Sequence, residues 1–159
     1  MQSRLEEMPK RYFVGIRNQM SLVNNTTLEL WKKFMPEKGN IKQTIGEELY
    51  SMEVYPRDYF QNFNPAATFE KWAAVEVKDK FILLDEMEYL TVPAGLYVVF
   101  HYVGSPKDAP QAYAFIFKQW LPASDFELDN RPHFAVMGEK YNNESDDSEE
   151  EIWIPIKAE

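Results

Sequence analysis

FKQWLP, residues 117–122, closely matches WKKFMP, residues 31–36, which lies 86 positions earlier in the chain (122 − 36 = 86). In both segments apolar side chains recur at helical spacing and a proline follows them. Because a proline ends or kinks a helix, each segment predicts the end of an amphipathic helix. The chain is therefore expected to contain two equivalent helices, one in each half.

Matched segments continue beyond the two helices. Glu53-Val-Tyr55 corresponds to Glu139-Lys-Tyr141 at the same offset (139 − 53 = 86), and Trp72-Ala-Ala-Val75 corresponds to Trp153-Ile-Pro-Ile156 at a shorter one (153 − 72 = 81). β-prone segments, such as LYVVFHYV in the second half, occur in the same order in both halves. The repeat predicts an α+β fold of two β-α-β-β units, over about residues 10–80 and about residues 86–158.

A single unit of this kind is too small to bury a stable core. We therefore expect one domain over residues 1–159, in which both units join their strands into one antiparallel sheet. Both helices would cover one face, and the opposite face would form a ligand groove between the halves. Residues 1–10 are interpreted as a charged lead-in, and Thr26 to Glu29 as a capping box that starts the first helix.

The composition limits the function classes. The net charge of −9 argues against direct DNA binding, because neutralising phosphates requires a basic surface. No apolar stretch is long enough to span a membrane, and neither a signal peptide nor a cysteine is found, which favours a cytoplasmic protein. Two histidines, His101 and His133, make a weak metal signal, so neither a metal nor another cofactor is expected. The acidic segment NNESDDSEEE lacks the spacing of a calcium loop and is expected to be solvated.

Several segments resemble one known family. PAGLYVVFHYVGS, FKQWLPAS, LDNRPHF, GEKY and EEEIWIPIK, together with LWKKFMP, LYSMEVYP and FEKWAAVEV, are similar to the gyrase-inhibitor-like effector-binding domain, also called the AraC-type effector-binding domain. The resemblance covers roughly residues 10–157 and implies the duplicated fold with a groove across its pseudo-twofold axis. It also implies a small-molecule sensor related to transcription regulators, here as a stand-alone bacterial member.

One position departs from the family pattern. Members usually carry a glutamate directly after the phenylalanine of the RPxF segment, where it contacts a cationic ligand or acts as the acid-base group of hydrolases. This chain has Ala135 there, and a methyl group can neither balance a charge nor move a proton. Glu139 is the only nearby carboxylate that could replace it, although a regular strand would place it roughly 13 Å away.

The aromatic residues and their neighbours supply the candidate ligand site, for which rings could stack on a flat or cationic molecule. Trp72 and Trp153 hold matched positions and are expected to face the groove from both sides. The same rings could instead fill the core, and Glu139 and Glu53 could be exposed strand ends. No catalytic residue is assigned, and the predicted ligand-binding residues are Trp72, Tyr97, His101, Trp120, Phe134, Ala135, Met137, Glu139 and Trp153.

Three functions remain open from the sequence. The first is a binding module that captures an amphipathic, aromatic or cationic organic molecule. The second is a hydrolase of small electrophilic compounds, against which Ala135 argues. The third is an acidic protein-interaction module that acts on gyrase, motivated by the net charge and the acidic segment. The chain is expected to be a monomer or a weak homodimer.

Overall fold

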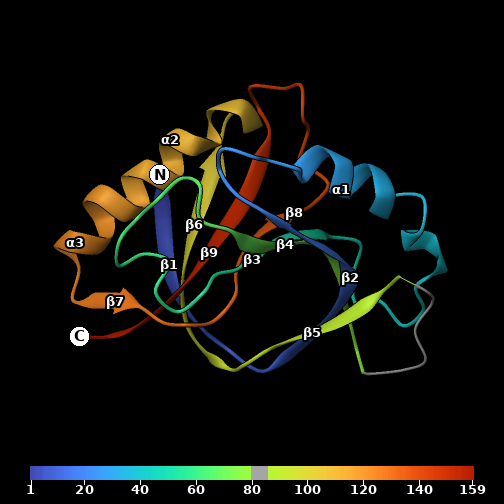
Figure 1. The fold of residues 1–159 in the computed structure, drawn as a ribbon, viewed down its shortest axis with the longest axis horizontal. Helices are drawn as coiled ribbons and strands as arrows, with labels where there is room; N and C mark the ends of the chain where they lie inside the picture. The colour runs from blue at the N-terminus through green and yellow to red at the C-terminus, as the bar shows by residue number, and fades with distance from the viewer. Residues whose placement is uncertain (80–85) are drawn as a thin grey trace.

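A computed structural model describes residues 1–79 and 86–159 of the chain. Its centre is a strongly curved antiparallel sheet with the strand order β1-β6-β9-β8-β3-β4-β2-β5, to which β7 adds beside β9 (Figure 1). The alternation of apolar and polar side chains along these strands is that of a sheet covered on its faces. The strands are β1 (Gln2–Met8), β2 (Arg11–Met20), β3 (Leu49–Val54), β4 (Phe69–Val77), β5 (Glu88–Val92), β6 (Gly95–Val103), β7 (Phe126–Leu128), β8 (His133–Met137) and β9 (Glu149–Ala158).

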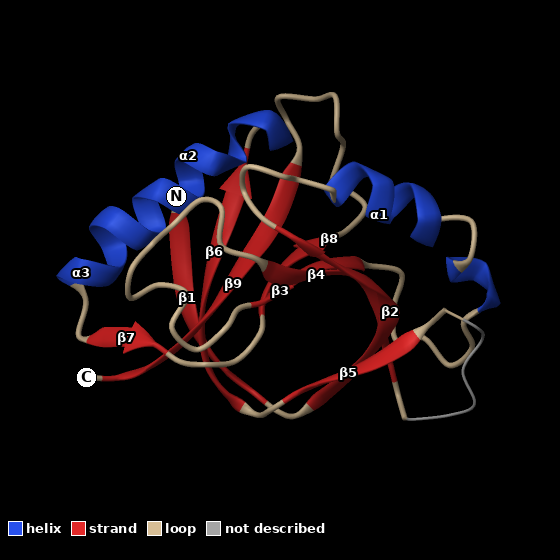
Figure 2. Ribbon diagram, viewed as in Figure 1, coloured by secondary structure: helices blue, strands red, loops and turns tan. Residues whose placement is uncertain are grey.

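The helices all lie over the convex face of the sheet (Figure 2). The first half contributes α1 (Thr27–Phe34), followed by a short 3-10 turn, η1 (Lys38–Asn40). The second half contributes one longer helical run: η2 (Pro106–Asp108), α2 (Ala109–Phe115), the π-helical turn η3 (Ile116–Trp120) and α3 (Leu121–Ala123). The duplicated α+β fold is therefore confirmed, with both helices on one face.

The start of the first helix differs from the prediction. The hydroxyl of Thr26 makes no capping hydrogen bond to the helix. Instead the side-chain oxygen of Asn25 accepts a hydrogen bond from the backbone N–H of Thr27 at 3.0 Å. The first free amide is thus satisfied by the preceding asparagine, and the expected capping box does not form.

Residues 2–8 are not a lead-in but a full edge strand, β1, which pairs with β6. Met8 lies opposite Gly95 in this pair, and Arg11 lies opposite Val92 in the pair of β2 with β5. In an antiparallel pair with an unbroken register, the numbers of the two partners always add up to the same value. Here both pairs add up to 103 (8 + 95 and 11 + 92), so one ladder continues through the breaks at residues 9–10 and 93–94. The two halves therefore exchange their outer strands, which cross at the bottom of Figure 2.

Most buried side chains of residues 1–79 and 86–159 belong to three large clusters. On the convex face, Leu30 and Phe34 of α1 pack on β2 and β4, while Ala112 and Ile116 of the second helix pack on β6 and β9. The concave face holds a third cluster, mostly aromatic, which joins the two halves. Its buried members are Met8, Phe13, Tyr50, Met52, Trp72, Ala74, Val92, Tyr97, Val99, Phe134 and Trp153.

The strand register corrects the alignment of the two repeats. Trp72 lies opposite Met52, and Trp153 lies opposite Phe134. Matching the two tryptophans therefore matches Met52 with Phe134, and hence Glu53 with Ala135 (135 − 53 = 82). The sequence match of Glu53 with Glu139 is not the structural one. Residue 80, the expected end of the first repeat, lies outside the described residues.

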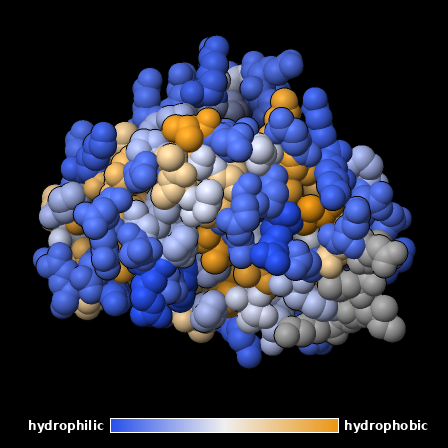
Figure 3. Space-filling view, in the orientation of Figure 1, coloured by the Kyte–Doolittle hydropathy of each residue, from blue (hydrophilic) through white to orange (hydrophobic). Residues whose placement is uncertain are grey.

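The surface in Figure 3 is mostly hydrophilic, and its apolar areas are small and separate. Such scattered apolar side chains are normal for a protein surface. Among residues 1–79 and 86–159, no helix is long and apolar enough to cross a membrane.

Candidate functional site

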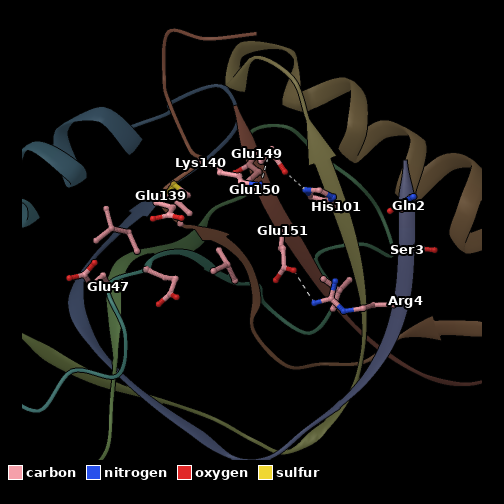
Figure 4. A pocket seen from close by; sticks show the side chains of 16 residues that line it. Gln2, Ser3, Arg4, Glu47, His101, Glu139, Lys140, Glu149, Glu150 and Glu151 are labelled. Atoms are coloured by element: carbon pink, nitrogen blue, oxygen red, sulfur yellow. Dashed lines mark hydrogen bonds and ion pairs between the residues drawn. The ribbon is translucent and has the colours of Figure 1, made fainter. Parts of the chain in front are cut away.

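An open pocket of about 930 Å³ lies at one end of the concave face, between the edge strand β1 and the ends of β8 and β3 (Figure 4). Its walls come from both halves of the chain, as expected for a groove at the repeat interface. The lining residues are Gln2, Ser3, Arg4, Glu47, Glu48, Leu49, Val99, His101, Val136, Met137, Gly138, Glu139, Lys140, Glu149, Glu150 and Glu151. We call this cavity the acidic pocket, because six of these residues are glutamates and only Arg4 and Lys140 carry a permanent positive charge.

Ion pairs fix the β1 side of the acidic pocket. Arg4 contacts Glu151 at 2.9 Å, and His101 contacts Glu149 at 2.7 Å (Figure 4). Within residues 1–79 and 86–159, Glu47, Glu48 and Glu139 take part in no ion pair. A pocket with this excess of carboxylates attracts cations.

A repeated Glu-x-Trp unit supports the concave face in both halves. The indole N–H of Trp153 donates to Glu151 at 3.1 Å, and that of Trp72 donates to Glu70 at 2.9 Å. Each glutamate also accepts from an arginine at 2.9 Å: Glu151 from Arg4, and Glu70 from an arginine of β2. Both tryptophans are buried, at 9% and 3% exposure, so they form the floor of the concave face rather than open walls.

The depth of the concave face is filled by the protein's own rings. Phe134 stacks on Trp153 with ring centroids 5.2 Å apart, and Tyr97 lies 5.4 Å from Phe134. On the other side Tyr50 lies 6.0 Å from Phe134. Burial raises the pKa of the Tyr50 hydroxyl to about 12. Val99 and Val136, which line the acidic pocket, lie opposite Trp153 and Tyr50, so this aromatic floor lies directly below the pocket.

The RPHF segment has a structural role at its start. Arg131 donates to the carbonyl oxygen of Leu96 at 2.6 Å and to that of Ile156 at 3.2 Å, and its guanidinium lies 4.7 Å from the ring of Tyr97. The hydroxyl of Tyr97 donates to the carbonyl oxygen of Pro132 at 2.7 Å. Arg131 and Pro132 therefore tie this loop to β6 and β9 and hold Phe134 in register.

Ala135 lies on the opposite, convex face. It is buried at 5% exposure, and its strand partners are Ser51 and Ile152. The repeat position equivalent to it is Glu53, which is also buried and contacts Lys71 at 2.5 Å. The carboxylate that is absent at residue 135 is thus present in the other half, where a lysine neutralises it.

A second polar group adjoins this ion pair. Burial, with the nearby charge of Glu53 adding to it, raises the pKa of Glu150 to about 7, whereas Lys71 acts in the opposite direction. Burial and the same glutamate also raise the pKa of Tyr113. Glu150 lines the acidic pocket as well, so it connects the pocket to the convex face.

Aromatic side chains of the segment 55–63 cover the central strands on the convex face. The ring of Phe60 stacks on His133 at 5.6 Å and on Phe117 at 5.4 Å, and Tyr55 packs edge-on against His133 at 4.9 Å. His133 is 4% exposed, and burial lowers its pKa to about 3. It is therefore a neutral core residue and does not lie at a site entrance.

The predicted site residues fall into three places. His101, Met137 and Glu139 line the acidic pocket. Trp72, Tyr97, Phe134 and Trp153 form its aromatic floor. Ala135 and Trp120 lie on the convex face, where Trp120 packs against Phe100 at 5.3 Å, so these two do not reach the pocket. Sequence reasoning missed the pocket residues Arg4, Glu149 and Glu151, although the repeated Glu-x-Trp spacing could have indicated Glu151.

Together, the fold and the pocket define a class of protein: a duplicated α+β domain with an open pocket between its halves. The family described as GyrI-like small molecule binding domain matches residues 1–157, so the chain belongs to this family.

Individual relatives agree with this assignment. The chain is 24% identical over 157 residues to the transcriptional regulator BrlR of Pseudomonas aeruginosa, covering 98% of this chain and 56% of BrlR. It thus spans little more than half of that regulator's length. Its fold is similar to that of SAV2435 bound to tetraphenylphosphonium, with a TM-score of 0.75 at 15% identity over 99% and 94% of the two chains. Its fold is also similar to that of the EcmrR C-terminal domain, with a TM-score of 0.69 at 16% identity, covering 99% of this chain and 98% of that domain.

Proposed function

We propose that this domain captures an aromatic organic cation in the acidic pocket, above the aromatic floor of the concave face. The observation that carries the proposal is a pocket of about 930 Å³ with six glutamates in its walls and tryptophan and tyrosine rings directly below them. Glutamates attract the cation, and ring faces stabilise it once water has been displaced. The tetraphenylphosphonium bound by SAV2435, which has the same fold, supports this ligand class.

Tetraphenylphosphonium is the probe for the first test. We expect it to change the tryptophan emission and to bind measurably in calorimetry, and we expect neutral triphenylphosphine oxide to bind more weakly. Raising the salt concentration should weaken the binding of the cation, because mobile ions screen the pocket charges. The absence of both an emission change and heat at millimolar probe would remove the proposal.

Glutamate variants locate the site. A unit charge about 5 Å from the cation contributes about 0.8 kcal/mol in a solvent-like dielectric, which is about fourfold in affinity. Glu139→Gln and Glu151→Gln should each weaken binding by about this factor. Glu127→Gln is the matched control, because Glu127 is exposed on β7 and does not line the pocket. Equal losses in all three variants would point to a general charge effect and not to this pocket.

Catalysis is not part of the proposal. The only site residue that the resemblance links to proton transfer is Ala135, which carries no titratable group and lies on the other face. Turnover of small electrophilic compounds by the unmodified chain would contradict this view. Salt-sensitive capture of gyrase in a pull-down would instead support the acidic interaction module.

We also propose a setting for this function. We place the domain in the cytoplasm as a monomer or weak homodimer that makes no direct contact with DNA. The net charge of −9 supports the last point, because a surface with this charge repels phosphates. A mobility-shift experiment with duplex DNA is expected to show no complex at physiological salt.

A further inference from the structure

A cation of the protein itself already lies in the aromatic floor. The Cζ atom of Arg11 lies 5.5 Å from the ring centroid of Phe13 and 5.6 Å from that of Tyr50. It lies 6.0 Å from the centroids of both Phe134 and Trp153. The four rings come from β2, β3, β8 and β9, so strands of both halves build one cage around the guanidinium.

Glu76 is the counter-ion of this arginine. Its two carboxylate oxygens accept from Nη2 of Arg11 at 2.7 Å and from Nε at 2.9 Å, and Nη2 also donates to the hydroxyl of Tyr50 at 3.0 Å. The remaining nitrogen, Nη1, donates only to the sulfur of Met8, at 3.7 Å, among the hydrogen bonds of the described residues. The side chains of Arg11 and Glu76 are 18% and 12% exposed.

These contacts are those of a cation-binding site. Several ring faces within about 6 Å of a positive charge form the arrangement that recognises quaternary ammonium and guanidinium groups, and a carboxylate completes the neutralisation. The ion pair of Arg11 with Glu76 has no net charge, so the cage does not favour an anionic ligand. The only charge that fits between these rings is positive.

The cage adjoins the acidic pocket. Arg4 lines the pocket and also lies 6.0 Å from the ring of Trp153, whose other contacts include Arg11. Trp153 therefore contacts both Arg4 of the acidic pocket and Arg11 of the cage.

We propose that Arg11 is a tethered cation that occupies an organic-cation subsite: an incoming ligand displaces the guanidinium and takes Glu76 as its counter-ion. This proposal rests on the proposed function and adds the residue that sets the affinity of the domain for the organic cation. A competing internal cation weakens every external one by the fraction of molecules in which the cage is free. Arg11 therefore raises the intrinsic affinity that any ligand needs before it occupies the cage.

Arg11→Met is the main test, in the full chain, with tetraphenylphosphonium in calorimetry. Methionine keeps an unbranched side chain but removes the charge, so we expect binding at least tenfold tighter. Arg11→Lys keeps a charge and is expected to bind close to the unmodified chain. Adding Glu76→Gln to Arg11→Met should reverse the gain by at least tenfold, because the ligand then has no counter-ion in the cage.

The unmodified chain gives a second readout that does not depend on a variant folding. In a nitrogen-proton spectrum the Arg11 Nε–H, held by Glu76, should give a protected signal that is lost or shifted at saturating tetraphenylphosphonium. An unchanged signal at saturation, or equal affinity in a folded Arg11→Met variant, overturns the role of Arg11 and leaves the pocket proposal intact. Absence of binding to both chains overturns the pocket proposal as well.

Discussion

Glu150 gives the sharpest prediction on stability, through the variant Glu150→Gln. Burial and the neighbouring charge of Glu53 raise the pKa of Glu150 from 4.5 to about 7. Because the pKa is higher in the folded state, the folded protein keeps this proton while the unfolded chain has lost it. Stability therefore falls as pH rises between about 4.5 and 7, and it stays reduced above pH 7.

The size of the effect follows from the shift. One pKa unit corresponds to 1.36 kcal/mol, so a shift of about 2.5 units (7 − 4.5) costs the folded state about 3 kcal/mol at pH 8. Glutamine has nearly the same shape and no proton to lose. The stability of Glu150→Gln relative to the unmodified chain should therefore rise by about 3 kcal/mol from pH 4.5 to 8.

Urea unfolding followed by circular dichroism at pH 4.5, 5.5, 6.5 and 8 measures this difference. Other titrating groups, including the buried His133, are common to both chains and largely cancel. Glu127→Gln, at an exposed position on β7 away from Glu150, is the control and should not show this rise. A difference curve for Glu150→Gln that is flat to within about 0.5 kcal/mol would refute the assigned burial of this carboxyl group.

Three further outcomes follow from the fold. Lys71→Met leaves the buried carboxylate of Glu53 without its partner and should cost about 3–5 kcal/mol in urea unfolding, whereas an exposed pair would cost less than about 1. Phe60→Ala removes the ring that covers His133, so the pKa of His133 should rise toward 6.5 in an NMR titration; an unchanged pKa would contradict the cover. Deleting residues 1–8 removes β1 and exposes the edge of β6, so size-exclusion chromatography should show association, and a stable monomer would argue against the exchanged strand.

The sequence predicted the elements that carry their own pattern. Both helices were found because apolar residues recur at helical spacing, although only Phe34 and Ile116 of the residues in that pattern are buried, and β4 and β9 were found because each has a tryptophan in an apolar run. β1 was missed because five of its seven side chains are exposed and mostly polar or charged, so it has no apolar face to recognise. Its strand character comes from backbone pairing with β6 across the exchange, a contact that no local pattern encodes.

The repeat was found with the wrong offset for a physical reason. The second helical run extends from residue 109 to 123, whereas α1 has eight residues, so matching the prolines at the helix ends shifts the alignment by about one turn. The buried residues give the structural offset, since Leu30 and Phe34 correspond to Ala112 and Ile116 (112 − 30 = 82). The length of a helix can vary beyond the part that packs on the sheet. The two repeats are therefore best aligned by the buried helix residues and the strand register.

The structural offset also shows which positions to compare when the charges of the two sheet faces are considered. Glu53 and Ala135 are equivalent positions on the convex face, yet one carries a neutralised carboxylate and the other a methyl group. Rings of the segment 55–63 cover that face, so an ionised group there would lose its water without gaining a partner. On the concave face the carboxylates of Glu47, Glu48 and Glu139 stand at a solvated rim, and the partly buried carboxylate of Glu76, among the rings, is held by Arg11. The concave face is therefore the one whose charges favour a cation, and in the proposal above a ligand that replaces Arg11 gains Glu76 as its counter-ion.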